Sequence, residues 1–300
     1  MKFLFLGLTA CLIAPVLSAA EKFSFVRPVL PGSCFECRVQ TRQSARYSFR
    51  LPGVDDPIVK QDSVQALFQG YLTVRDVKAA GSPSRMKIRA DHLSGSINGR
   101  TTTADLPGGT DIEAVRTDGR SVFSSGAVSL TPEHSVLLSV LFPPPCGTLA
   151  DLAGLDRLLE KPGQGWKPDL TLFLKQLARR GILLKPSAFK SGVTYHGREK
   201  YGRFDCRKFT LLIESCTLSD YDCRLKITFW IAPSGPPVRI VRDATEVIRQ
   251  VPRSGEPFAA GTRIELFAED HTEQVLVPVE RIPPAKKRGT PSGGWDVFLH

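Results

Sequence analysis

The residues most able to do chemistry are the cysteines, which number seven in the 300-residue chain. Cys34 and Cys37 form a C-x-x-C motif, a spacing found in redox pairs, in half of a zinc site and in local disulfides. Zinc would need a second C-x-x-C or a nearby pair of histidines, and the sequence has neither. A redox pair begins a helix, whereas a strand-like run follows this motif. Structural disulfides are the preferred interpretation.

The first twenty residues predict export, which makes disulfides the expected state. Lys2 supplies a positive charge, residues 3–17 are apolar, and Ser18-Ala19-Ala20 offers small residues for cleavage before Glu21. As an alternative, Cys11 ends a lipobox-like Leu-Thr-Ala-Cys, where lipidation would anchor the chain in the outer membrane. No later apolar stretch approaches the ~20 residues of a membrane-spanning helix. We therefore expect a periplasmic or extracellular protein that is not integral to a membrane.

Cleavage after Ala20 leaves six cysteines, an even number that suits a disulfide framework. Cys216 and Cys223 flank a short loop and are predicted to pair. The sequence does not decide the remaining pairs, so all six are disulfide candidates: Cys34, Cys37, Cys146, Cys206, Cys216 and Cys223.

Catalytic signatures are missing from the sequence. It contains no H-E-x-x-H, no G-x-S-x-G, no P-loop and no G-x-G-x-x-G. Ser84 begins an S-x-x-K match inside a predicted strand, and a second match at Ser187 overlaps the K-S-G that would have to be separate. Both are interpreted as chance matches. We expect no enzyme activity, no metal and no cofactor.

Positive charge is concentrated in one stretch. The chain has 40 Lys and Arg against 30 Asp and Glu, and residues 157–208 carry a net charge of +9. Lys175, Arg179 and Arg180 lie on a predicted helix whose other side is apolar. They form either a solvated face or a docking surface for an anionic lipid or glycan. Nucleic acid is not an expected partner, because no nucleic-acid-binding motif is found.

Two tryptophans are further candidates for ligand contact. Trp166 stands just before the basic helix, where it would most often fix the helix to a sheet. Trp230 shares the polar face of a predicted strand with Lys226 and Thr228. We expect Trp230 to be covered by a helix or to line a cleft.

The elements that must position these residues are mostly short strands separated by turn residues. Alternation between apolar and polar side chains is clearest over residues 86–90 and 225–231, and Asn98-Gly99 is a favoured hairpin turn. The pattern predicts a mainly β (α+β) fold of antiparallel sheets. The expected strands are 35–50, 64–78, 86–91, 111–117, 120–124, 126–130, 193–200, 203–214, 223–232, 237–249, 262–269 and 274–281.

Two helices are expected between the strand-rich parts. Thr148 begins a capping box, and leucines at 149, 152, 155 and 159 follow at helical spacing. The second helix starts at Pro168 and stops at Gly181. With a boundary at the proline run 143–145, the expected organisation is a signal peptide (1–20), a β unit (21–145), a unit with both helices packed on its sheet (146–284) and a flexible tail (285–300).

Residues 197–209 and 227–240 carry a resemblance to a known group. The run Ile-Thr-Phe-Trp-Ile-Ala-Pro-Ser-Gly-Pro-Pro-Val-Arg-Ile, preceded by Gly-Arg-Glu-Lys-Tyr-Gly-Arg-Phe-Asp-Cys-Arg-Lys-Phe, resembles the strand–turn–strand of LolA/LppX-like periplasmic carriers. The lead-in at Gly165-Trp166-Lys167 is similar to that of uncharacterised exported bacterial proteins. The resemblance implies a strongly curved antiparallel sheet that wraps helices and encloses an apolar cavity for acyl chains. It covers a minor part of the chain and assigns no binding residue.

Together these observations predict an exported, non-enzymatic envelope protein. It would bind an apolar or amphiphilic anionic ligand, or dock to the envelope surface. The alternative is a structural or assembly factor that binds an envelope protein through an exposed sheet edge. An apolar cavity would favour the first function, and a long uncovered edge strand the second.

Overall fold

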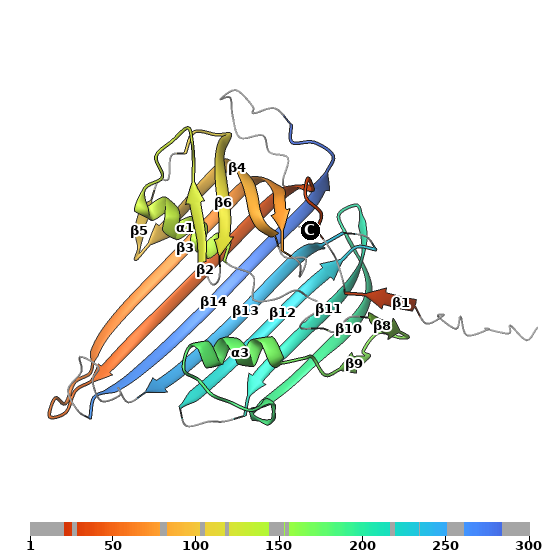
Figure 1. Cartoon of the computed structure of the whole chain (residues 1–300). Coiled ribbons are helices and arrows are strands. Elements are labelled where there is room, and N and C mark those ends of the chain that lie inside the picture. The colour runs from red at the N-terminus through yellow and green to blue at the C-terminus, as the bar shows by residue number, and fades with distance from the viewer. Residues whose placement is uncertain are drawn as a thin grey trace, which may run out of the picture.

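A single large antiparallel sheet dominates the computed structural model of the chain (Figure 1). The structure describes residues 21–25, 29–78, 83–102, 106–117, 120–143, 153, 156–216, 220–233, 235–250 and 261–283. Its strands are β1 (Glu21–Ser24), β2 (Cys34–Arg50), β3 (Ile58–Val77), β4 (Pro83–Ile97), β5 (Arg100–Thr102), β6 (Thr110–Thr117), β7 (Arg120–Ser124), β8 (Asp156–Leu159), β9 (Gly165–Trp166), β10 (Phe189–Tyr201), β11 (Phe204–Ser215), β12 (Tyr221–Ile231), β13 (Pro237–Gln250) and β14 (Arg263–Val279). The helices are α1 (Pro132–Leu141), α3 (Thr171–Arg179) and a 3-10 turn at Pro186–Ala188.

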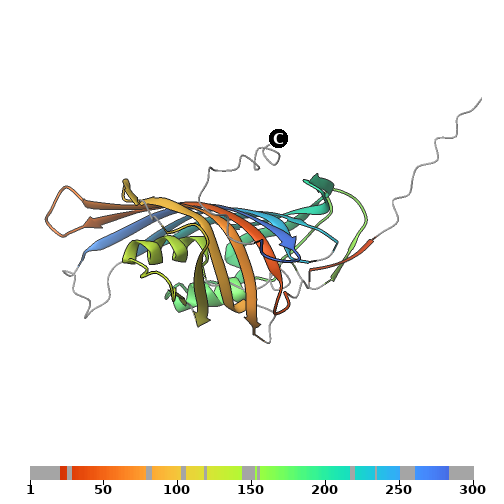
Figure 2. The same cartoon turned by 90° about the horizontal axis from the view of Figure 1, so that it is seen from above.

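The strand order shows that the two expected units share this sheet. It runs β7-β6-β4-β3-β2-β14-β13-β12-β11-β10-β9, with β5 beside β4, while β1 and β8 form a separate pair. The link is the pairing of β2 with β14, which extends from Arg263 opposite Arg50 to Val279 opposite Cys34. The sheet curves into an arch, and both helices lie on its concave side (Figure 2). The expected mainly β fold with curved antiparallel sheets is confirmed.

Alternation along the strands separates the two faces of the sheet. On β12, Leu225, Ile227 and Phe229 face the concave side, as the sequence predicts, and the charged residues point outward. The type I′ hairpin turn at Asn98-Gly99 is also confirmed, with φ angles of 52° and 74°. The long strand β14 replaces the two shorter strands expected at 262–269 and 274–281.

The concave face carries two hydrophobic clusters, one under each helix. Under α1, the fully buried Phe68 and Ile88 pack against Leu137 and Leu138 of the helix. Under α3, Phe209 is the centre of an aromatic cluster that includes Phe23, Phe25, Tyr195 and Phe229, with ring centroids 5.0–5.5 Å from its own. Each helix therefore covers its own part of the arch and leaves the middle between them.

Helix α3 agrees with the sequence prediction, whereas two other expectations are wrong and one helix was missed. Residues 126–130 are not a strand, because Gly126 begins a series of bends that leads into α1. Helix α1 was not expected, although its start has a readable signal: Thr131 Oγ1 accepts from His134 N, and His134 Nδ1 accepts from Thr131 N. Asp156–Leu159 was expected to end a helix, but it forms β8 because it pairs with β1.

Several predictions fall outside the described residues. These are the signal peptide or lipobox in residues 1–20, the capping box at Thr148, the cysteine at position 146 and the tail from 285 to 300. Within the predicted first helix, the structure describes Ala153, which is helical and buried.

Candidate functional site

A cavity of about 480 Å³ lies in the middle of the arch, between α3 and the concave face of the sheet. Arg180, directly after α3, binds Glu246 of β13, which shows that Glu246 faces the helix. Strand register then places the residues beside Glu246 on this same face. They are Gln43, Ala45, Asp62, Val64, Tyr221, Cys223, Leu225, Arg242, Ala244, Ala268 and Asp270, and with Phe173 of α3 they line the cavity. Ser44, Ser63, Arg224, Thr245 and Glu269 complete its lining from adjacent strand positions.

Small side chains on the floor give the cavity its room. Ala45 of β2 lies opposite Ala268 of β14. On β13, Ala244 is two residues from Glu246 and therefore on the same face. An alanine side chain ends at Cβ, so these positions leave empty the space under α3 that larger side chains such as Phe209 fill elsewhere on this face. The walls are apolar where Phe173 and Leu225 approach, so apolar side chains line these walls and the alanine part of the floor.

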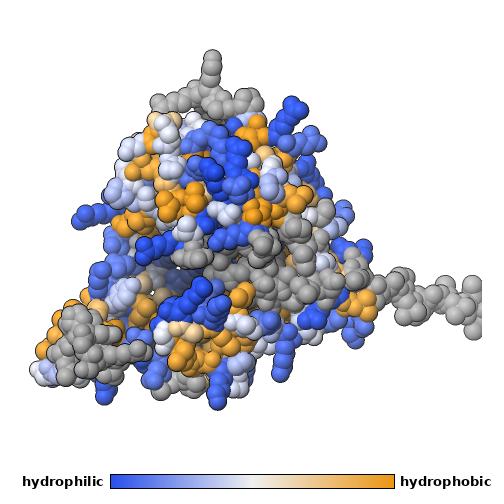
Figure 3. Space-filling view, in the orientation of Figure 1, coloured by the Kyte–Doolittle hydropathy of each residue, from blue (hydrophilic) through white to orange (hydrophobic). Residues whose placement is uncertain are grey.

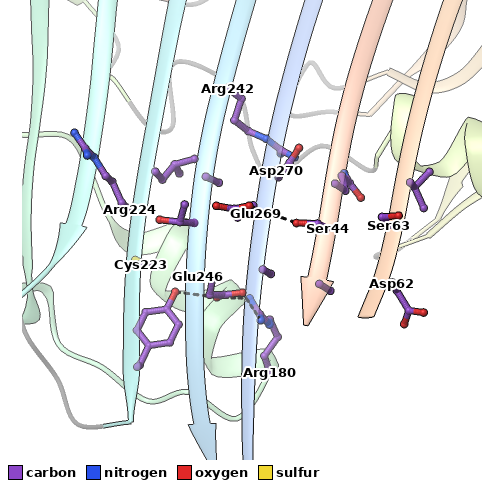
Figure 4. Close-up of a pocket in the computed structure, with 18 of the residues that line it drawn as sticks. Ser44, Asp62, Ser63, Arg180, Cys223, Arg224, Arg242, Glu246, Glu269 and Asp270 are labelled. Atoms are coloured by element: carbon purple, nitrogen blue, oxygen red, sulfur yellow. Dashed lines mark hydrogen bonds and ion pairs between the residues drawn. The ribbon is translucent and has the colours of Figure 1, made fainter. Parts of the chain in front are cut away.

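An ion pair closes the cavity where α3 ends (Figure 4). Arg180 binds Glu246 through both terminal nitrogens, at 2.8 and 2.7 Å, in the bidentate geometry that favours arginine. The Tyr221 hydroxyl donates to the same carboxylate at 3.0 Å. The bond to Glu246 raises the pKa of Arg180, and burial raises the pKa of Tyr221. Both groups keep their protons throughout the neutral range, so this contact is insensitive to pH there.

A second ion pair, between Arg242 and Asp270, lies on the floor beside the alanines. Its side chains are 29% and 18% exposed, respectively. Asp270 also accepts from the Thr272 hydroxyl at 2.9 Å, and Thr272 contacts the buried Thr41 hydroxyl at 2.9 Å. The cavity is therefore amphipathic: its alanines and Phe173 adjoin two ion pairs, Arg180–Glu246 and Arg242–Asp270, which together form its polar row.

The residues predicted from the sequence fall in four different places. Arg180 reaches the cavity, whereas Lys175 and Arg179 are exposed on the outer side of α3. Trp166 packs against the cluster under α3, and its Nε1 donates to Ala153 O at 2.7 Å. Trp230 points to the convex face. The sequence prediction missed the alanine floor and the Arg242–Asp270 pair, and register across β2, β13 and β14 was the information it lacked.

Among the described residues, side chains and not a helix cover Trp230. Its ring lies 4.7 Å from the Arg239 guanidinium and 5.0 Å from the Lys208 ammonium, and Tyr201 packs beside it. The indole Nε1 donates to Glu199 at 3.0 Å, and Glu199 also pairs with Lys208. Trp230 is 5% exposed, so this cation–π arrangement serves packing on the convex face.

The expected disulfides are absent among the described cysteines, all five of which are free: Cys34, Cys37, Cys206, Cys216 and Cys223. Cys34 lies opposite Thr73 and Cys37 opposite Gly70, so these two side chains, three residues apart on β2, point to opposite faces. Cys216 follows the end of β11, and it is Ser215 Oγ that accepts from Cys223 N, at 2.8 Å. Strand alternation therefore separates Cys34 from Cys37, and Ser215, not Cys216, contacts Cys223.

The free cysteines should differ strongly in reactivity in the folded protein. Burial raises the pKa of Cys37, which is fully buried, and raises the pKa of Cys206 to about 11. Cys34 is partly exposed. At pH 8 we expect iodoacetamide to alkylate Cys34 at least ~100-fold faster than Cys37 or Cys206. Peptide mass spectrometry of time points measures the three rates, and the difference should disappear in urea. Equal rates in the folded state, or thiols already oxidised, would contradict the assignment.

Other site chemistries find little support in the described residues. They contain no group of three or more His, Cys, Asp or Glu side chains able to hold a metal ion. Among the same residues, no helix has the length and apolar character to span a bilayer. What the cavity offers is hydrogen bonding and ion pairing beside an apolar floor, which suits binding.

Comparison with known proteins does not place the chain in a family. No family model matches the chain, and no curated protein matches it. A lipovitellin structure that concerns lipid–protein interactions aligns with 87% of this chain at 11% identity and a TM-score of 0.31, and this chain spans 27% of it. A DUF1329 family protein from Desulfovibrio piger aligns with 78% of this chain and 83% of its own length, at 10% identity and a TM-score of 0.16. OccK11 of Pseudomonas aeruginosa aligns with 86% of this chain and 100% of its own, at 7% identity and a TM-score of 0.19. Similarity at this level assigns no family to the chain.

Proposed function

We propose that this protein is an exported binding protein that holds the apolar part of one amphiphilic molecule in the cavity between α3 and the sheet. The observation that carries the proposal is the amphipathic cavity itself, with its alanine floor and its polar row. Its volume of about 480 Å³ falls in the range of roughly 300–1,000 Å³ typical of small-molecule sites. Export rests on the character of residues 1–20.

The polar row orients the ligand. An acyl chain would cover Ala244 and Ala268, so that its head group reaches Arg180 or Arg242. Both arginines already pair with a carboxylate, Glu246 and Asp270 respectively. An anionic head group would therefore share these arginines with the carboxylates and gain less than it would at an unpaired arginine. We propose that apolar burial supplies most of the affinity and that the arginines orient an anionic head.

A probe with a fluorescent acyl chain tests the site directly. We expect 11-dansylaminoundecanoate to bind, and Ala244→Leu with Ala268→Leu to weaken that binding about tenfold or more. The reason is that filling the floor displaces roughly two methylenes of the probe, at about 0.8 kcal/mol each. Fluorescence titration measures both dissociation constants.

The matched control makes the same type of change where there is no cavity. Ala127→Leu enlarges an exposed alanine between β7 and α1, and it should leave the dissociation constant unchanged. Uncharged N-phenylnaphthylamine, titrated in parallel, measures what the acidic head contributes. Equal affinity of the double variant and the unaltered protein would refute this site. Native mass spectrometry of protein purified from its own envelope should then identify the natural ligand as a co-purified lipid.

The alternative function, recognition of a protein through a sheet edge, has weaker support. In the described strand order the sheet ends at β7, which has 5 residues, and at β9, which pairs with only Val193 and Thr194 of the 13-residue β10. A short edge strand such as β7 is protected against pairing with another chain, whereas β10 offers a longer edge for this alternative. We prefer the cavity because its amphipathic lining indicates the chemistry of a ligand, which a strand edge alone does not.

A further inference from the structure

The outer side of α3 and the segment after it form a surface that the cavity does not explain. A groove of about 420 Å³ runs there, lined by Leu174, Lys175, Ala178, Leu183, Leu184 and Lys185. Leu183 is 82% exposed, the highest value among the large hydrophobic residues found on the surface. With Arg179, which is also exposed, these six residues define the α3 outer surface. Figure 3 shows apolar and hydrophilic patches side by side over this part of the molecule.

The backbone after α3 fixes Leu183 in this outward position. Gly181 has a φ of 82°, and Ile182 N donates to Leu177 O at 2.9 Å, which closes the end of the helix. This turn directs Ile182 into the cluster under α3, where it is 9% exposed. The next residue must then point away from the cluster. A large apolar side chain is thus held at the surface by the fold, with no described cluster to pack against.

Positive charge surrounds this leucine. Lys175, Arg179 and Lys185 are exposed, and none of them forms an ion pair within the described part of the chain. They differ in this from Arg180, which is bound by Glu246. The sequence pattern grouped Arg180 with the other two basic residues of the helix, whereas the structure replaces it on this surface by Lys185.

We infer that the α3 outer surface docks onto a bilayer that contains anionic phospholipid. An exposed leucine between cations matches the two layers of a membrane surface: Leu183 enters the acyl boundary, and the lysines and the arginine remain among the phosphates. Each basic residue near an anionic surface strengthens binding by about fivefold (~1 kcal/mol). A protein partner would have to supply carboxylates for three separate cations, whereas headgroups are free to move to them.

This inference does not depend on a ligand in the cavity, because it uses the opposite side of α3. If both hold, docking brings the helix that covers the cavity against the bilayer. An amphiphile would then travel a short distance between the membrane and its site. The two proposals fail separately, since one is measured with a soluble probe and the other with vesicles.

Vesicle co-sedimentation tests the surface at ~50 mM salt. The protein should bind phosphatidylcholine vesicles in which one lipid in three is phosphatidylglycerol, and should bind pure phosphatidylcholine at least tenfold more weakly. The triple variant Lys175→Gln, Arg179→Gln, Lys185→Gln should lose roughly 50-fold or more in affinity. The Leu183→Ser variant should bind the same anionic vesicles with about tenfold lower affinity, although its charge is unchanged.

The control removes the same charge from the convex face of the sheet. Arg42, Lys190 and Lys226 are exposed residues of β2, β10 and β12, and their change to Gln alters the net charge by the same amount. That control variant should keep most of the vesicle binding. Equal loss in the two triple variants would reduce the effect to net charge and overturn the inference, as would binding unaffected by Leu183→Ser. Circular dichroism of each variant confirms that it is folded before it is compared.

Discussion

Phe209→Ala should lower the free energy of unfolding by about 3–5 kcal/mol, one of the two largest effects expected from a single substitution here. The Phe209 ring is fully buried and lies within 5.0–5.5 Å of four other aromatic rings, those of Phe23, Phe25, Tyr195 and Phe229. Truncation would therefore leave a cavity that the surrounding side chains cannot fill together. Urea unfolding followed by tryptophan fluorescence measures the change.

The exposed Phe267 on β14 provides the matched control. Its side chain is 38% exposed on the convex face, so Phe267→Ala removes the same atoms with much less loss of packing. We expect a change of at most about 1 kcal/mol. If Phe209→Ala cost no more than Phe267→Ala, the aromatic cluster would not be the centre of the core under α3.

Gly95→Ala should destabilise the other end of the arch by about 1–3 kcal/mol. A Cβ atom at Gly95 would lie 2.4 Å from Gln65 O and 2.6 Å from Leu137 Cδ2. The first contact is with the backbone of the paired strand β3, and the second is with α1. Either the strands separate or the helix rises from the sheet, and both responses expose the cluster under α1.

Gly192→Ala makes the same change on β10 where it should do no harm. A Cβ atom there meets nothing within 4 Å, so stability should change by less than about 0.5 kcal/mol. The two melting curves, recorded together, compare the positions. Similar melting temperatures for both variants would show that α1 does not rest directly on Gly95.

Local sequence patterns predicted much of the secondary structure. Alternation identified the strands of the second half to within a few residues, and the leucines before Gly181 identified α3. The same kind of pattern failed at Asp156–Leu159, because leucines at helical spacing also suit a strand when a partner, here β1, is available. Pairing with a segment so distant in the sequence leaves no local signal.

The candidate site was harder to predict because its residues meet only through strand register. Ala45, Ala244 and Ala268 are ordinary residues in the sequence, and they become a floor only when β2, β14 and β13 lie side by side. Arg180 was identified from its charge, but its direction was not, since a helix pattern cannot show that Glu246 lies across the cavity. The Cys34–Cys37 spacing was misleading for a related reason. Residues three apart can meet in a turn, whereas on an extended strand such as β2 their side chains point to opposite faces.

The pairing of β2 with β14 also governs the order in which the chain can fold. Thr41 and Thr272 touch across this seam although 231 residues separate them in the sequence. During synthesis or export, β2 emerges long before β14, and its seam edge stays unpaired until β14 follows. Contacts between such distant segments slow folding, and an open strand edge favours aggregation in the interval. A chaperone that shields this edge until residue 279 has emerged would therefore raise the yield of native protein.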